Sequence, residues 1–142
     1  MAITQAVANS FKTEVLTGTH NFTATTGDSF KLALYTNSAT ISKSTTAYTT
    51  SNEVSGTGYT AAGNTLTSVT PVLSSDTAVC DFADTSWTSA TITARGALIY
   101  NDTQSDKAVV VLDFGGDKTS TAGTFTIQFP AADASNAILR LA

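Results

Sequence analysis

The N-terminal region is the one part of the chain in which apolar residues recur with a helical period. Ile3, Val7, Phe11 and then Val15 with Leu16 recur at a spacing of three to four residues, and Gly18 follows as a helix stop. This pattern predicts one short amphipathic helix within residues 3–17. Its apolar stripe either covers the domain's own β-sheet or docks onto a partner, and the sequence does not separate these two interpretations.

Beyond Gly27 the apolar period changes from that of a helix to that of a strand. Phe30, Leu32 and Leu34 alternate with other residues, which predicts a half-buried strand that ends near Thr36. Further strands are predicted at residues 59–61, 66–70, 77–83, 90–100, 107–114, 124–129 and 137–141.

Glycine and proline mark the ends of several of these strands. Pro71 has no amide hydrogen to donate, so it predicts an edge strand or a loop for the residues that follow it. The run 115–123 predicts a nine-residue hairpin loop that joins strands at 107–114 and 124–129. About seven or eight strands with regular turn signals favour an all-β fold, a single antiparallel β-sandwich or jelly-roll-like barrel with one short N-terminal helix.

No internal repeat or linker divides the chain, so residues 1–142 are expected to form a single β domain in which residues 1–22 make an N-terminal helix or arm. Residues 37–58 have no sustained period and predict a long surface loop, which is a candidate contact surface. The alternative is a partly ordered excursion with a short edge strand near Glu53. Tyr48 and Trp87 lie among Ser and Thr residues and are candidate surface anchors.

Composition supports the β assignment, and the charged and apolar residues are distributed in a way that argues against nucleic acid and membrane as partners. The chain contains 28 Thr and 15 Ser residues, whereas charged residues make up 13 % of it and the net charge is −4. Thr favours strands over helices because its side chain branches at Cβ. The few Lys and Arg residues are scattered, so we expect no nucleic-acid partner. No apolar run is long enough to span a membrane, and no secretory signal is recognised, so folding in a cytosol is expected.

The single cysteine and the single histidine do not form a recognisable catalytic or metal-binding pattern. Cys80 lies in an alternating apolar run, which predicts a buried structural thiol. Any catalytic triad or dyad that needs a histidine would have to use His20, and we instead expect His20 in a loop or an interface.

Two acidic pairs, Asp81 with Asp84 and Asp113 with Asp117, lie where strands are predicted to pass into turns. Paired carboxylates serve in acid/base chemistry or bind calcium, but Asp is also common at such positions because its side chain bonds the local backbone. We favour turn formation for both pairs. No catalytic residue, cofactor or metal is therefore expected, and the chain is not expected to be an enzyme.

Short motifs spread over nearly the whole chain resemble one protein family. They are Phe11-Lys12, Leu16-Thr17-Gly18-Thr19-His20-Asn21-Phe22, Phe30-Lys31-Leu32-Ala33-Leu34-Tyr35-Thr36, Gly56-Thr57-Gly58-Tyr59-Thr60 with Gly63, Asp81-Phe82-Ala83-Asp84 with Trp87, and Thr93-Ala94-Arg95-Gly96-Ala97-Leu98-Ile99-Tyr100. With these motifs the chain resembles small virion structural proteins of tailed bacteriophages, of the capsid decoration or cement type. The resemblance implies a protein of the capsid surface, made in the bacterial host cytoplasm, that binds the major capsid protein of the assembled head and self-associates as a homotrimer.

We expect the partner contacts at Phe11, Val15 and Phe22 of the N-terminal region and at Tyr48 of the long loop. Two alternatives stay open. One is a tail or fibre adaptor or a receptor-binding domain, which the Ser- and Thr-rich loops also fit. The other is a carbohydrate-binding β-sandwich that uses one of the two acidic pairs.

Overall fold

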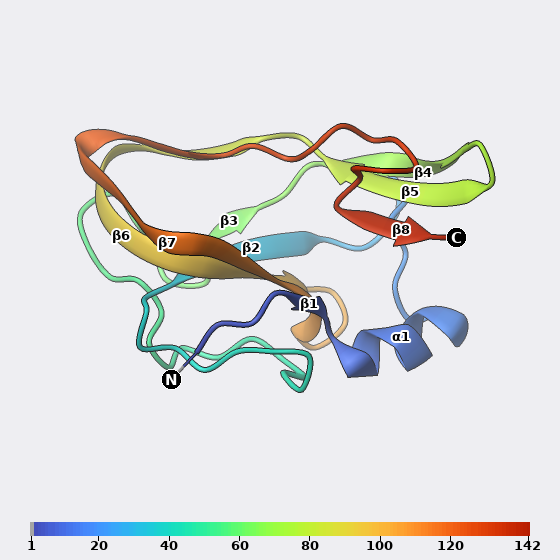
Figure 1. The fold of residues 1–142 in the computed structure, drawn as a ribbon, viewed down its shortest axis with the longest axis horizontal. Coiled ribbons are helices and arrows are strands. Elements are labelled where there is room, and N and C mark those ends of the chain that lie inside the picture. Colours follow the sequence, from blue (N-terminus) through green and yellow to red (C-terminus); the bar gives the residue numbers. More distant parts are fainter. Residues whose placement is uncertain (1) are drawn as a thin grey trace.

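Two antiparallel β-sheets and one short helix make up the computed structural model, which describes residues 2–142 (Figure 1). The strands of the larger sheet, in spatial order, are β1 (Ala6–Val7), β7 (Lys107–Ile127), β6 (Thr85–Asn101), β2 (Phe30–Tyr35) and β3 (Asn64–Thr65). The smaller sheet contains β4 (Ser68–Ser74), β5 (Thr77–Phe82) and β8 (Leu139–Leu141). The helix is α1 (Asn9–Leu16). The predicted all-β sandwich with one short helix is confirmed.

The long hairpin of β6 and β7 belongs to both layers of the molecule. The two strands are paired from Thr85 opposite Ile127 to Asn101 opposite Lys107. Figure 1 shows that they curve over at one end, so that one half of the hairpin lies beside β2 and the other half runs toward β5. The pairing register shifts four times along this hairpin. Such β-bulges bend and twist a strand pair, and they allow one hairpin to form two layers.

The predicted hairpin loop at residues 115–123 is wrong, because these residues belong to the continuous strand β7. Asp113 lies opposite Gly96 and Lys118 opposite Ala94, so the residues between Asp113 and Lys118 face Arg95 alone. They form a wide bulge in which Gly115 has a φ of +80°. Glycine permits this backbone conformation in a bulge as readily as in a turn, which is why the sequence signal is ambiguous.

The helix is shorter at its N-terminal end than the prediction of residues 3–17. Ile3 forms a parallel bridge with Ile41, and Val7 is in β1, opposite Val110. A spacing of four residues is even, so it also keeps side chains on one face of a strand. The predicted stop at Gly18 is confirmed: its φ is +78°, and the Thr19 amide donates to the Glu14 carbonyl at 3.0 Å.

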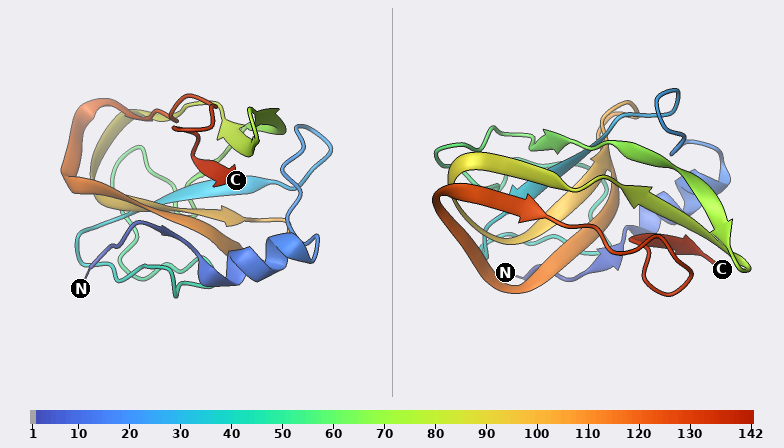
Figure 2. Two further views of the ribbon diagram at one scale, coloured as in Figure 1. Left: turned by 45° about the vertical axis from the view of Figure 1, so that its right-hand side comes forward. Right: turned by 90° about the horizontal axis from the view of Figure 1, so that it is seen from above.

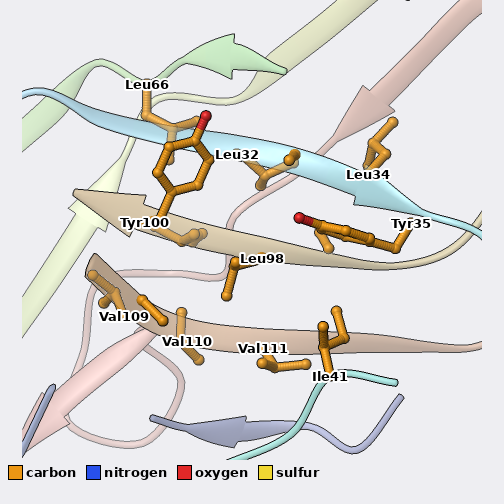
Figure 3. Packing of buried hydrophobic residues seen from close by; sticks show 14 of the residues in the cluster. Leu32, Leu34, Tyr35, Ile41, Leu66, Leu98, Tyr100, Val109, Val110 and Val111 are labelled. Carbon is orange, nitrogen blue, oxygen red and sulfur yellow. The ribbon is translucent and has the colours of Figure 1, made fainter. Parts of the chain in front are cut away.

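Residues 37–58 contain no regular strand, yet they pack against the larger sheet. Ala39, Ile41 and Val54 are buried, and the Val54 amide donates to the Leu34 carbonyl at 2.9 Å. Figure 3 shows Ile41 beside Val111 of β7. Because this segment covers one face of the sheet, β2 is buried on both faces and not half-buried as predicted. The segment is thus largely a cover for the core, with exposed residues between its buried ones.

One prediction for the small sheet is confirmed, and one prediction for the core is wrong. β4, which contains Pro71, is confirmed as an edge strand, and its register with β5 shifts between Val69 and Val72. Trp87, however, is buried and packs against Tyr59 and Phe125, so its assignment as a surface anchor is wrong.

No helix within residues 2–142 has the length and apolar character required to cross a lipid bilayer.

Candidate functional site: an apolar end of the molecule

The large apolar side chains that stay exposed within residues 2–142 gather on three elements at one end of the molecule. They lie on α1, β4 and β8, and we call them the apolar end: Leu16, Val69, Val72, Leu73 and Leu141. Figures 1 and 2 show that α1 and the small sheet occupy the same end of the molecule, opposite the bend of the β6–β7 hairpin. Leu16 is 82 % exposed and Leu73 is 74 % exposed, so these side chains contribute little to the fold of the isolated chain.

Between α1 and the small sheet lies an apolar groove with a volume of about 470 Å³. Its twelve lining residues contain no acidic side chain: Val7, Phe11, Lys12, Val15, Leu16, Phe22, Pro71, Ala78, Cys80, Leu139, Arg140 and Leu141. Leu16 and Leu141 are members of both the groove and the apolar end. A hollow of this size and polarity is typical of a site that takes up apolar groups of another molecule.

The paired strands β5 and β8 form one wall of the groove. Leu139 lies opposite Cys80 and Leu141 lies opposite Ala78, so these four side chains share one face of the small sheet. On the helix side, Phe11 and Val15 are four residues apart and therefore lie on one face of α1. The apolar stripe of the N-terminal region and the end of the chain, which are far apart in the sequence, thus form one surface.

Three of the four residues expected to contact a partner lie at this groove. Phe11 and Phe22 line it, but each is less than 10 % exposed, and Val15 is half-buried. Phe22 stacks on Phe30, with ring centroids 4.3 Å apart, so the innermost lining residues of the groove belong to the core of the domain. Among the outer residues of the apolar end, Leu16 belongs to the predicted N-terminal stripe. Those on β4 carry no such signal, because an apolar residue on a short edge strand looks the same in the sequence whether it points inward or outward.

Tyr48 lies elsewhere, in a cluster that fixes the long segment to the sheet. Its hydroxyl donates to the Glu53 carboxylate at 2.5 Å, and its ring stacks on Tyr100. Burial and the neighbouring Glu53 raise the pKa of Tyr48 to about 12. Glu53 also accepts hydrogen bonds from the Tyr59 hydroxyl at 2.6 Å and the Ala62 amide at 2.8 Å. These contacts give Tyr48 a structural role in holding residues 37–62 together.

Cys80, the chain's single cysteine, is half-buried in the groove wall. Burial raises the pKa of its thiol to about 11, so the reactive thiolate is scarce at neutral pH. The predicted structural role is consistent with this position, although the side chain is less buried than expected.

His20 is buried, and both of its ring nitrogens are engaged. Nε2 lies 3.0 Å from a Glu14 carboxylate oxygen, and Nδ1 lies 2.9 Å from the Asn101 side-chain nitrogen. Because the Asn101 amide nitrogen can only donate, Nδ1 accepts, and the proton of the neutral ring is on Nε2. The expected loop position of His20 is confirmed, since it lies in the segment between α1 and β2. Its buried ring pins the end of α1 to β6 and offers no free nitrogen as a general base.

Asn101 and Asp28 complete this buried network. The Asn101 side chain donates to Asp28 at 2.8 Å and accepts from the amides of Thr103 and Gln104. Burial acts to raise the pKa of Asp28, but hydrogen bonds from the Asn101 side chain, the Asn21 amide and the Gln104 side chain act in the opposite direction, and this pKa lies below its ordinary value.

Because its folded-state pKa is lowered, ionised Asp28 stabilises the fold above the ordinary Asp pKa, and this stabilisation is lost as the pH falls through the lowered pKa. We expect Asp28→Asn to lower the free energy of unfolding at pH 7 and to make it less sensitive to pH between about 5 and 2. Urea unfolding at several pH values measures both effects. Asp117→Asn, at an exposed carboxylate bonded to Asn37, is the control; equal acid sensitivity in wild type and Asp28→Asn contradicts the prediction.

Of the two acidic pairs, Asp113 bonds its local backbone, as expected for a turn residue, whereas Asp84 and Asp117 bond residues distant in the sequence. Asp84 accepts from the Phe129 amide at 2.8 Å, and Asp113 accepts from the Gly115 amide at 2.9 Å and from Arg95 at 3.2 Å. Asp113 also lines a second hollow of about 590 Å³, beside Phe114 and Phe129. No group of three or more His, Cys, Asp or Glu residues within residues 2–142 is arranged to hold a metal ion.

The apolar end is therefore the most prominent candidate site of the molecule. It combines exposed apolar side chains with an adjoining groove, and it is built from both ends of the chain.

Comparison of the chain with protein-family models, with curated proteins and with solved structures finds no match.

Proposed function

We propose that the protein is a non-enzymatic structural protein of a bacteriophage virion, a capsid decoration protein that binds the assembled head through the apolar end and stabilises it. The observation that carries the proposal is the gathering of the exposed large apolar side chains on α1, β4 and β8. The resemblance of the sequence motifs to decoration proteins supports the same conclusion. The proposed partner is the major capsid protein, and the proposed location is the capsid surface.

Burial of the apolar end supplies the driving force for this binding. Covering a large exposed side chain such as Leu73 contributes about 1.5–3 kcal/mol. The chain as a whole is rich in Thr and Ser, and charged residues make up only 13 % of it, so a broad contact removes few charged groups from water. A protein that binds the closed shell and not its separated subunits raises the free energy needed to open the shell.

Self-association strengthens the attachment further. In a homotrimer, three weak contacts with neighbouring capsid subunits act together, and such avidity raises the overall affinity by about 10²–10⁴. The apolar end of each copy then faces the head, and the bend of the β6–β7 hairpin points away from it (Figure 1).

The direct test measures binding of purified protein to heads that lack it. Leu16→Asp and Leu73→Asp are expected to weaken this binding by about tenfold or more each, because each loses the burial of a leucine and adds a charge at the contact. Both side chains are exposed, so the thermal stability of the free protein should change little. Thr121→Asp, which adds the same charge at an exposed position of β7, a strand outside the apolar end, is the matched control.

Unchanged binding of both leucine variants contradicts the role of the apolar end. Failure of the wild-type protein to bind heads at all contradicts the decoration function. Binding at the tail instead, in few copies per particle, favours the adaptor or fibre alternative.

A further inference from the structure

The second half of β7 has a neighbouring strand on one side only. β6 pairs with β7 along its length, whereas β1 covers the other side of β7 at Val110 and Val111 alone. Next on that side, the Asp113 amide donates to the Gln5 side chain at 3.1 Å. Beyond Asp113, no strand within residues 2–142 lies along this side of β7. We call residues 124–128 the free edge.

The backbone groups of Thr126 point to the open side of the free edge. Thr126 lies opposite Ser86, and the Ser86 carbonyl accepts from the Asn64 side chain at 3.0 Å. Asn64 belongs to β3, on the side of β6 away from β7. Ser86 and Thr126 are therefore a pair that exchanges no backbone hydrogen bonds, and the N–H and C=O of Thr126 point outward. Because these directions alternate along a strand, those of Thr124 point outward as well.

The free edge lacks the features that protect other sheet edges from pairing. β4, the edge strand of the small sheet, contains Pro71 and a register shift. In contrast, residues 119–132 contain no charged residue, and the free edge contains no proline. The nearest bulge of β7 itself lies at Ala122, before the free edge begins. A regular, uncharged edge of this kind is a template for pairing with another strand.

The hollow of about 590 Å³ runs along the free edge and is apolar inside. Its apolar lining residues are half-buried or buried: Leu112, Phe114, Phe125, Ile127, Phe129 and Ile138. Within the free edge, Phe125 and Ile127 face inward, and Thr124 and Thr126 are exposed. A strand added beside β7 continues this alternation, so its inward side chains lie over the hollow. The site thus fits an uncharged strand with apolar residues at alternate positions.

We propose that the free edge pairs with the free edge of a second copy, as antiparallel strands related by a twofold axis near Thr126. Residues 124–128 themselves have the alternation that the site requires. Phe125 and Ile127 of each copy extend the inner face of the other and cover its hollow. This inference goes beyond the proposed function, because a twofold contact is separate from the contacts within a homotrimer and joins copies of neighbouring trimers.

Charge favours a second copy as the occupant. Each copy has a net charge of −4, so contact between copies is favourable only where charged residues are absent, as they are here. Near a twofold axis each residue lies opposite itself, and Thr opposite Thr is a favourable cross-strand pair. The hollow shares no lining residue with the apolar groove, so the contact with a second copy and the contact with the head use different residues.

Disulfide formation tests the proposed register. Thr126→Cys, in a Cys80→Ser background, should give a disulfide-linked dimer on oxidation, because opposite residues of an antiparallel pair lie within disulfide range. Ser86→Cys in the same background is the matched control, since Ser86 is exposed and lies opposite Thr126 on β6. Its two copies would lie three strand spacings apart, about 14 Å. We expect the dimer to form about tenfold faster or more with Thr126→Cys.

Removal of one outward amide tests the pairing without a cross-link. Thr126→Pro deletes an N–H that has no place in the ladder with β6, so the fold should be kept and the pairing lost. In sedimentation equilibrium at equal concentration, its weight-average mass should be lower than that of wild type by about twofold or more. Thr126→Val keeps the amide and should behave as wild type does. Circular dichroism checks that each variant is folded.

These measurements use the free protein, so they do not depend on whether it binds heads. Equal rates of dimer formation for the two cysteine variants overturn the inference, as does an equal mass for wild type and a folded Thr126→Pro protein. If the Thr126→Cys protein instead cross-links to the capsid protein on heads and never to another copy, the free edge takes a foreign strand and the inference is wrong. In each case the decoration function stands.

Discussion

Gly63→Ala is expected to destabilise the fold by about 3 kcal/mol, which corresponds to a fall of roughly 10 °C in Tm. Gly63 has a φ of +78°, where a side chain is strained. A Cβ at this position would lie 1.8 Å from the Leu32 carbonyl oxygen and 2.8 Å from the Ala33 Cα. These are backbone atoms of the central strand β2, so relief of the clash requires β3 to move away from it.

Differential scanning calorimetry or thermal circular dichroism measures this effect. Gly116→Ala is the matched control, because a Cβ there meets nothing within 4 Å and the backbone is not in the positive-φ region. An unchanged Tm for Gly63→Ala would show that the turn before β3 does not lie against β2 as described.

Asn101→Ala is expected to cost about 3 kcal/mol, because it leaves several partners of one fully buried side chain unsatisfied at once. His20 loses the donor to Nδ1, Asp28 loses a hydrogen bond, and the amides of Thr103 and Gln104 lose their acceptor. The network joins α1, β6 and the segment before β2, so its loss should loosen the helix that forms one wall of the groove.

Urea unfolding gives the change in free energy, and hydrogen exchange of the α1 amides reports the loosening. Asn37→Ala removes an exposed asparagine whose side chain donates to Asp117 alone, and it should change stability by less than about 0.5 kcal/mol. Equal effects of the two substitutions would mean that the buried network contributes no more than a surface contact.

The sequence predicts the fold class and most strands because local periodicity is strong where one side of a strand meets the core. The alternation of Phe30, Leu32 and Leu34 identifies β2, and Pro71 identifies an edge strand. The stop at Gly18 is predicted because a positive φ after a helix is a local requirement.

The errors arise where the same local signal fits two structures. A glycine such as Gly115 serves a hairpin turn or a bulge, and only the pairing with β6 decides between them. Ile3 and Val7 have a spacing that fits both a helix and a strand. The burial of Trp87 depends on Tyr59 and Phe125, which are distant in the sequence and belong to no local pattern.

The candidate site is predictable only in part for the same reason. Phe11, Val15 and Phe22 stand out in the N-terminal stripe, and they do line the groove. The opposite wall comes from β5 and β8, and Leu139 and Leu141 become part of the groove only when β8 pairs with β5. Tyr48 is conspicuous in a polar segment, but its hydroxyl is bound by Glu53, a contact within the fold.

We propose that this protein stabilises an assembled phage head by binding it through the apolar end. The most direct measurement is the temperature at which heads release their DNA, compared for heads without the protein, heads with wild-type protein added back, and heads with the Leu16→Asp/Leu73→Asp protein added at the same concentration. We expect a higher release temperature for heads with wild-type protein than for bare heads or for heads with the variant. Equal release temperatures for bare heads and for heads saturated with wild-type protein would contradict it.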